Sequence, residues 1–233
     1  MKIAFLSEFI TSKNVLMQSV VIYVVVSLVI GVSMQSPLAM VACIGAMTPF
    51  LMVFTFCALD GMNGWERFRA TLPVSRAAIV ASRYANVLAA SVVMLLLGWA
   101  ITMALSAAVP ALPIGVEAAE SFASEASNPA LVLCAGVLGM GITLFAIAFI
   151  LPFALRFGMT KAIRIAPIAL ALLLPVSIFF MRQVPDMAQL LSQASLWLDQ
   201  NIVLATALFI TAVLTAYAAS CVVAVAMYRS KEL

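Results

Sequence analysis

The residues best suited to catalysis or to binding a partner lie in one polar segment, residues 60–84, between two long apolar runs. Its first part reads DGMNGWERFRATLP and combines Trp65 and Phe68 with flanking arginines. Trp and Arg are strongly enriched among the energetically dominant contacts of protein interfaces. The pattern predicts docking to another protein rather than catalysis. A solvated loop whose aromatic rings only touch lipid headgroups is the alternative.

Capping signals divide this segment into two helices. Asn63 can cap a first helix, with Glu66 reaching back from its third position. Pro73 ends that helix, because the residue before a proline avoids helical angles. Ser75 can then cap a second helix that continues into the next apolar run. We therefore expect a short helix over residues 64–69, fixed beneath the membrane between two spans.

The residue types needed for catalysis or metal binding do not form a recognisable constellation in the sequence. There is no His, and the 4 Cys residues stand singly inside apolar runs, so neither a zinc site nor a disulfide framework is expected. No G-x-x-x-x-G-K-[ST] motif is present, so ATP binding by this chain is not expected. We predict a protein that is not an enzyme and has no cofactor of its own.

The elements that position residues 60–84 follow from the composition. Hydrophobic residues make up 66% of the 233 residues and charged residues 9%, against about 25% charged residues in a soluble domain. A bilayer span needs about 20 apolar residues. Six runs qualify, namely 15–34, 37–59, 84–109, 129–155, 165–181 and 202–228. We predict an all-α membrane protein whose six transmembrane helices form one domain, residues 1–233.

The charges predict how these spans are oriented. Eleven of the 12 Lys and Arg residues fall on one side of the predicted membrane: Lys2, Lys13, Arg67, Arg69, Arg76, Arg83, Arg156, Lys161, Arg164, Arg229 and Lys231. The other side has only Arg182 among several carboxylates. The positive-inside rule then places both termini in the cytoplasm, with the spans in the cytoplasmic membrane.

Two amphipathic segments are expected at the membrane surfaces. Residues 1–14 have helical spacing of apolar residues, with Glu8 among the polar ones, which predicts an interfacial helix on the inner leaflet. A disordered leader is the alternative. On the outer side, residues 186–198 have an apolar helical face, which predicts an outer amphipathic helix between the fifth and sixth spans.

The fourth predicted span has two notable features. One side of the span is thin, so that another helix can approach closely, because it carries Gly136, Gly139 and Gly141. Pro152 and Gly158 are expected to break it near its cytoplasmic end.

The predicted spans contain no ionisable residue, which argues against ion-coupled transport. If the chain moves a substrate, its energy must come from a partner. The residues that suggest such a partner are Asp60, Trp65, Glu66, Leu72, Pro73, Val74, Ser75, Arg76, Ile79, Val80, Ser82, Arg83 and Tyr84. With the order of the helices, they resemble the permease subunit of type-2 ABC transporters. The likeness is strongest to the compact group that includes bacterial antimicrobial-peptide, toxin-peptide and lantibiotic-immunity permeases. Arg83 stands where that group usually has Lys.

The resemblance implies a coupling helix made of Gly64, Trp65, Glu66, Arg67, Phe68 and Arg69. It implies that this helix inserts into a cytoplasmic P-loop ATPase subunit, which would hold ATP and magnesium. It also implies a second permease chain, identical or related, and contact with membrane lipid but no nucleic acid. Uncharged spans favour hydrophobic or amphipathic cargo, such as a peptide or a lipid-like molecule. A membrane anchor, sensor or immunity protein that recruits a partner without transport is the alternative.

Overall fold

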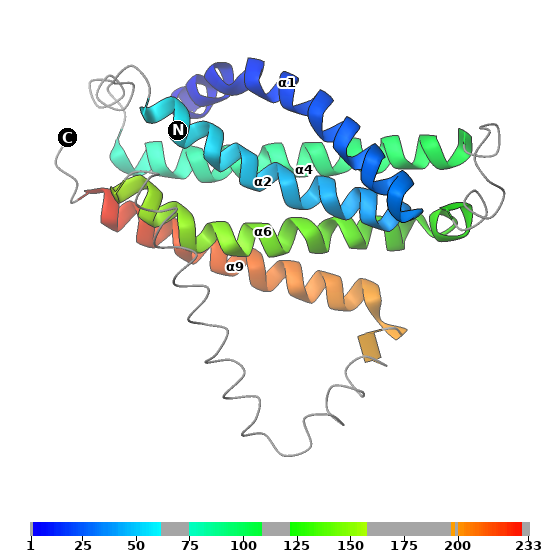
Figure 1. The fold of residues 1–233 in the computed structure, drawn as a ribbon. Helices are drawn as coiled ribbons and strands as arrows, with labels where there is room; N and C mark the ends of the chain where they lie inside the picture. The colour runs from blue at the N-terminus through cyan, green and yellow to red at the C-terminus, as the bar shows by residue number, and fades with distance from the viewer. Residues whose placement is uncertain (1, 62–74, 109–121, 158–196, 199, 230–233) are drawn as a thin grey trace.

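The computed structural model describes residues 2–61, 75–108, 122–157, 197–198 and 200–229, and these residues form helices without any strand. The long helices are α1 (Lys2–Met34), α2 (Pro37–Gly61), α4 (Arg76–Ala108), α6 (Pro129–Phe157) and α9 (Ile202–Arg229). Four of these helices lie side by side, and α1 crosses over α2 and α4 (Figure 1). The predicted fifth span, the coupling helix and most of the outer amphipathic helix lie outside the described residues.

The helices are long and apolar enough to cross a membrane. Within the described residues, four segments meet that condition: Pro37–Ala58, Arg76–Ala107, Pro129–Arg156 and Ile202–Tyr228. A shorter apolar stretch, Val20–Gly31, lies within α1. Large apolar side chains point outward along these helices, with Val222 71% exposed and Met17 67% exposed. Such a surface is stable only in contact with lipid or with other apolar chains.

Residues 1–14 and 15–34, predicted as an interfacial helix and a span, are joined in the structure. Helix α1 runs without interruption from Lys2 to Met34. No proline or glycine occurs before Gly31, so nothing in the sequence stops the helix at residue 14. Glu8, expected among the polar surface residues, is only 3% exposed and faces α4 instead.

The turn between α1 and α2 is fixed by local hydrogen bonds. Gln35 has a positive φ of 52°, and the Ser36 amide donates to the Gly31 carbonyl at 3.2 Å, which closes the end of α1. The Ser36 hydroxyl then accepts the Ala39 amide at 3.4 Å and caps α2. Helices α1 and α2 are therefore consecutive antiparallel neighbours, as the short connection predicts.

Helices α2 and α6 approach each other through small residues. A Cβ atom on Gly45 would overlap the Gly136 carbonyl oxygen, and one on Gly139 would overlap the Ala42 carbonyl oxygen. The predicted thin side of the fourth span is thus confirmed for Gly136 and Gly139, and α2 is the helix that packs there. Gly141 faces Phe209 of α9 instead. This close approach allows extensive van der Waals contact between the two central helices.

The basic residues gather at one end of the bundle. We call this end the arginine end: Arg76 and Arg83 lie in the first turns of α4, Arg156 near the end of α6, and Arg229 at the end of α9. Figure 1 shows that the start of α1 lies at the same end. At the opposite end, the described parts of the chain contain no Lys or Arg, and Glu125 accepts a hydrogen bond from the Ser36 hydroxyl.

Replacing Gly45 with alanine should destabilise the protein by about 2 kcal/mol, because the added methyl group meets backbone atoms of α6 that cannot move independently. The thermal unfolding midpoint of the purified protein in detergent measures this. Gly31→Ala is the matched control, since the atoms nearest to its methyl group would belong to the Met40 side chain, the first at 3.2 Å. Equal losses from the two substitutions would contradict the direct contact of α2 with α6.

Candidate functional site

The predicted docking segment connects α2 to α4. Helix α2 ends at Gly61 and α4 begins at Arg76. Asp60 lies in the last turn of α2. Gly64–Arg69, Leu72 and Pro73 lie outside the described residues, so their predicted roles stay predictions. The structure places the rest of the motif at the start of α4, at the arginine end.

The predicted cap at Ser75 is confirmed. Its hydroxyl oxygen accepts the Ala78 amide at 3.2 Å, and its carbonyl accepts the Ile79 amide at 3.2 Å. Ser75 and Arg76 are both exposed. The chain therefore passes directly from the predicted docking segment into a rigid helix of 33 residues.

Arg83, two turns into α4, is buried rather than exposed to solvent. Its side chain and that of Glu8 from α1 are each 2% exposed, and Arg83 Nη2 lies 3.4 Å from Glu8 Oε1. The guanidinium carbon also lies 5.7 Å from the centre of the Phe56 ring of α2, within the range of cation–π attraction. One arginine thus holds the starts of α1 and α4 to the end of α2.

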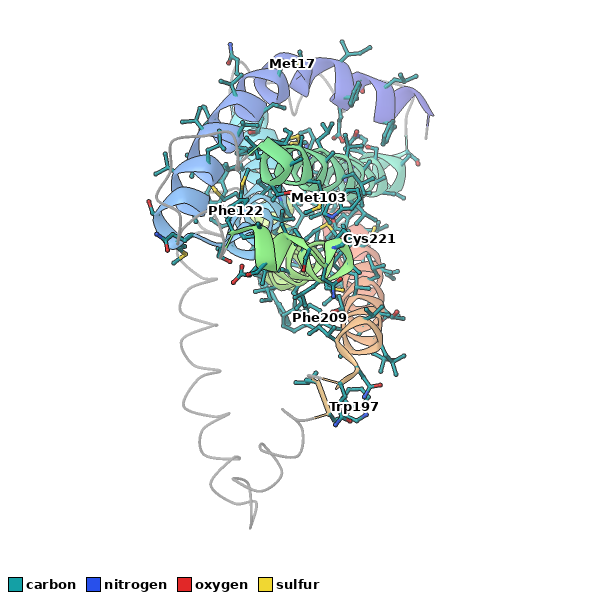
Figure 2. The ribbon with its side chains drawn as sticks, turned by 90° about the vertical axis from the view of Figure 1, so that its right-hand side faces the viewer. Met17, Met103, Phe122, Trp197, Phe209 and Cys221 are labelled. Carbon is teal, nitrogen blue, oxygen red and sulfur yellow. The ribbon has the colours of Figure 1, made fainter. Side chains whose placement is uncertain are left out.

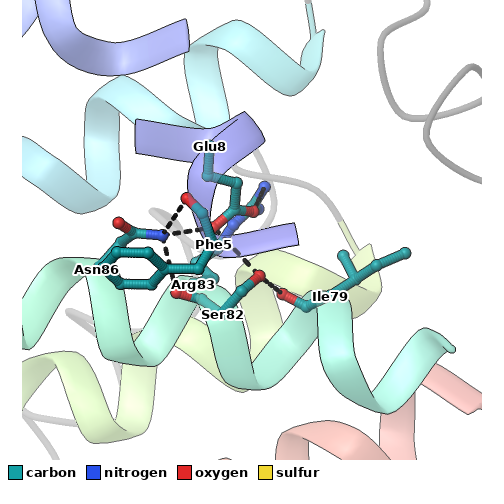
Figure 3. Close-up of polar contacts among 6 residues, drawn as sticks. All are labelled: Phe5, Glu8, Ile79, Ser82, Arg83 and Asn86. Atoms are coloured by element: carbon teal, nitrogen blue, oxygen red, sulfur yellow. Dashed lines mark hydrogen bonds and ion pairs between the residues drawn. The ribbon is translucent and has the colours of Figure 1, made fainter. Parts of the chain in front are cut away.

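The Glu8 carboxylate has two further partners on α4. Its Oε2 accepts a hydrogen bond from the Asn86 amide at 3.4 Å. It also lies 3.4 Å from the Ser82 hydroxyl, whose one proton is shared with the Ile79 carbonyl at 2.8 Å (Figure 3). The same Asn86 amide nitrogen donates to the Phe5 carbonyl at 3.3 Å and to the Ser82 carbonyl at 3.0 Å. We call Glu8, Ser82, Arg83 and Asn86 the Glu8 cluster. A buried carboxylate is stable only with such compensation, so the cluster fixes the register of α1 on α4.

Tyr84, the last residue of the motif, belongs to a second buried group. Its hydroxyl lies 2.9 Å from Ser220 Oγ, and Ser220 in turn donates to the Ala148 carbonyl of α6. Because the Ser220 proton is used there, Tyr84 must be the donor to Ser220. Tyr217 donates to the Tyr84 carbonyl at 3.1 Å, and the two rings lie 4.8 Å apart between centroids. We call Tyr84, Ala148, Tyr217 and Ser220 the Tyr84 node.

The predicted break at Pro152 is wrong, and the Tyr84 node supplies the physical reason. Helix α6 continues through Pro152 to Phe157, and Gly158 lies outside the described residues. Proline has no amide proton to donate to the carbonyl four residues earlier, which is that of Ala148. The Ser220 hydroxyl of α9 donates to that carbonyl instead. Helix α9 therefore satisfies the acceptor that would otherwise be unpaired at membrane depth.

Sequence reasoning found Arg83 and Tyr84 but missed the residues they bind. Glu8, Tyr217 and Ser220 come from distant parts of the chain, with Glu8 75 positions before Arg83. One signal was available: an arginine at the start of an apolar run requires a partner, and Glu8 is the carboxylate nearest the chain start. Nothing in the sequence pointed to Ser220, which is one hydroxyl among many.

Removing one member of the buried ion pair should be costly, whereas removing both should not. Glu8→Leu or Arg83→Met alone is expected to destabilise by about 3–5 kcal/mol, because the remaining charge stays buried. The double variant should lose clearly less than the sum, as measured by thermal unfolding in detergent. Arg76→Met, at the exposed start of the same helix, serves as the control with little effect. Additive losses would show that the two charges do not interact.

Ser220→Ala should destabilise by about 1 kcal/mol, because it leaves the Ala148 carbonyl without its donor. In a Pro152→Ala background the same change should be less damaging, since the alanine introduced there has an amide proton that can be donated to the Ala148 carbonyl. A double-mutant cycle on unfolding midpoints measures this coupling. If Ser220→Ala lowers the unfolding midpoint equally in both backgrounds, the Ser220 hydroxyl does not replace the amide proton that Pro152 lacks.

Comparison with known proteins matched a family profile to this chain. The family profile described as "ABC-2 family transporter protein" matches residues 5–229, which include both the Glu8 cluster and the Tyr84 node. No curated protein and no solved structure gave a significant match. Since the profile covers nearly the whole chain and the described helices are long enough to span a bilayer, the chain is a multi-pass membrane protein. It belongs to the ABC-2 family of transporter proteins, as a transmembrane permease of an ABC transporter.

Proposed function

We propose that this permease is one half of an exporter in the bacterial cytoplasmic membrane, driven by ATP that a separate cytoplasmic subunit hydrolyses. The observation that carries the proposal is the position of Arg83 and Tyr84. Both lie within about 14 Å along the helix axis of Ser75, where the predicted docking segment enters α4. Through them, α4 is tied to α1, α6 and α9.

The proposed mechanism is mechanical. ATP binding closes the partner ATPases and displaces the helix at residues 64–69, and α4 passes that displacement to the bundle. The Glu8 cluster makes the start of α1 follow α4, because separating them would expose a buried charge to hydrocarbon. The Tyr84 node makes α6 and α9 follow as well. The spans then rearrange to open an inner cavity outward.

The arginine end supports a cytoplasmic location for both termini. Helices α6 and α9 run in the same direction in Figure 1, so the chain between them joins opposite ends of the bundle. That arrangement supports a further crossing at 165–181 and a total of six spans. It also supports the proposal that residues 64–69 lie on the cytoplasmic side, where an ATPase can reach them, and that residues 186–198 lie on the outer side.

The cargo we propose is hydrophobic or amphipathic, and peptide-like, and it passes between two permease chains. Thr48 and Thr102 are fully buried, and each donates to a carbonyl of its own helix at 2.8 Å. Their hydroxyls are therefore used within the chain, which supports a pathway that recognises its cargo chiefly by apolar contact.

Co-expression with a P-loop ATPase subunit of the proposed kind tests the docking. Trp65→Ala combined with Arg69→Glu should weaken recovery of the ATPase in a pull-down by about tenfold or more, because Trp and Arg anchors each contribute about 2 kcal/mol or more. Trp197→Ala combined with Arg182→Glu is the matched control, with the same changes on the predicted outer side. Unchanged ATPase recovery by the first variant would refute docking through residues 64–69.

The same preparation distinguishes transport from mere recruitment. Reconstituted complexes should hydrolyse ATP faster when an amphipathic cationic peptide is present, and the peptide should accumulate inside inverted vesicles only with ATP. Binding of the ATPase without any ATP-dependent peptide movement would favour the alternative function of a membrane anchor or immunity protein.

A further inference from the structure

An apolar cavity of about 380 Å³ lies between α1, α2 and α4, beside the Glu8 cluster. Its walls include Phe5, Phe9 and Met17 of α1, Met52 of α2, and Val93 and Leu97 of α4. Figure 2 shows α1 arching over the other helices, with Met17 near the top of the arch. We propose that this cavity is a binding site for one acyl chain of a membrane lipid.

The cavity opens to the surface that contacts hydrocarbon. Several of its lining residues are exposed large apolar side chains: Phe9 is 46% exposed, Met17 67% and Val93 55%. Apolar side chains with this exposure lie in lipid when they belong to spanning helices. An occupant can therefore enter sideways from the bilayer without crossing water.

The dimensions match the lipid chains of one leaflet. The cavity follows α4 from Asn86 to Leu97, a distance of about 16 Å along the helix axis. This is about half of the roughly 30 Å hydrocarbon thickness of a bilayer. Because Asn86 lies toward the arginine end, the matching leaflet is the one at that end.

The two ends of α1 are held, which limits how wide the cavity can become. The Glu8 cluster fixes α1 to α4 at one end, and the closed turn at Gln35 and Ser36 fixes it to α2 at the other. A flexible acyl chain can enter between such fixed points. A helix from a second chain, about 10–12 Å wide with its side chains, would have to pull α1 away from the Glu8 cluster.

The cavity has one polar group, and it lies at the end nearer the headgroups. Asn86 is 3% exposed and lines the cavity. Its amide nitrogen makes three hydrogen bonds within the Glu8 cluster, whereas its amide oxygen points away from Glu8 (Figure 3). Among the described residues, no donor to that oxygen is found. A hydroxyl or ammonium group of a lipid could donate to it, which would position the lipid with its chain along the cavity.

The experiment uses the full chain reconstituted in vesicles of phosphatidylethanolamine and phosphatidylglycerol. A trace of phosphatidylethanolamine with a diazirine group on one acyl chain is photolysed, and the labelled residues are identified by mass spectrometry. We expect labels to concentrate on cavity residues of α1 and α4, and to remain there after the protein is washed in detergent before photolysis. Ala89→Phe, which fills the cavity from α4, should reduce this labelling about tenfold, equivalent to about 1.4 kcal/mol of binding.

Ala100→Phe is the matched control, because Ala100 is an exposed alanine on the same helix, about three turns further on and outside the cavity lining. It should leave the labelling unchanged. Labels spread evenly over all exposed helix faces, or lost on washing, would show ordinary surrounding lipid and overturn the proposal. So would labelling that Ala89→Phe does not reduce, or cross-links from the cavity to a second copy of the chain. None of these outcomes depends on ATPase docking or on the direction of transport.

Discussion

A polar group buried between apolar helices must find its partner inside the protein, because no water is present there to replace it. This constraint explains the two buried polar groups of the bundle. Arg83 and Glu8 lie buried as a pair, and Asn86 also donates to the carboxylate. Each group joins helices that are far apart in the sequence, so satisfying the constraint also decides how the helices assemble.

The same constraint explains why Pro152 leads to a contact between two helices. Pro152 leaves the Ala148 carbonyl without a donor from its own helix, and Ser220 of α9 donates to it. Tyr84 donates to Ser220, and Tyr217 donates to the Tyr84 backbone. The Ala148 carbonyl of α6 is thus connected, through the hydroxyl groups of Ser220 and Tyr84, to α4, the helix that follows the docking segment. In water the same carbonyl would simply bind solvent, and no such link would be needed.

These links explain how a small displacement at the membrane surface could reach the whole bundle. Helices α2 and α6 touch through Gly45 and Gly139 at backbone distance, which leaves little room for independent movement. Helix α4 is tied to α1 by charge and to α9 by hydroxyl groups. The middle of α1, by contrast, borders an apolar cavity rather than a packed neighbour. A bundle built this way combines a rigid centre with one side that lipid can occupy.

The sequence by itself determined the membrane class, the bounds of the spans predicted at 37–59, 129–155 and 202–228 to within two residues, and the cap at Ser75. These depend on local properties, namely the length of apolar runs, the positions of arginines and the hydrogen-bonding ability of single side chains. It also indicated that Gly136 and Gly139 would allow a close helix contact. Only the tertiary structure decided that α2 makes this contact, that residues 2–34 form one helix, and that Pro152 does not end α6. It also decided that Glu8 pairs with Arg83 and Ser220 with Ala148. The reason is physical: the partner of a buried charge or carbonyl is set by which distant helices pack together, and apolar spans of similar composition do not encode that choice in any local pattern.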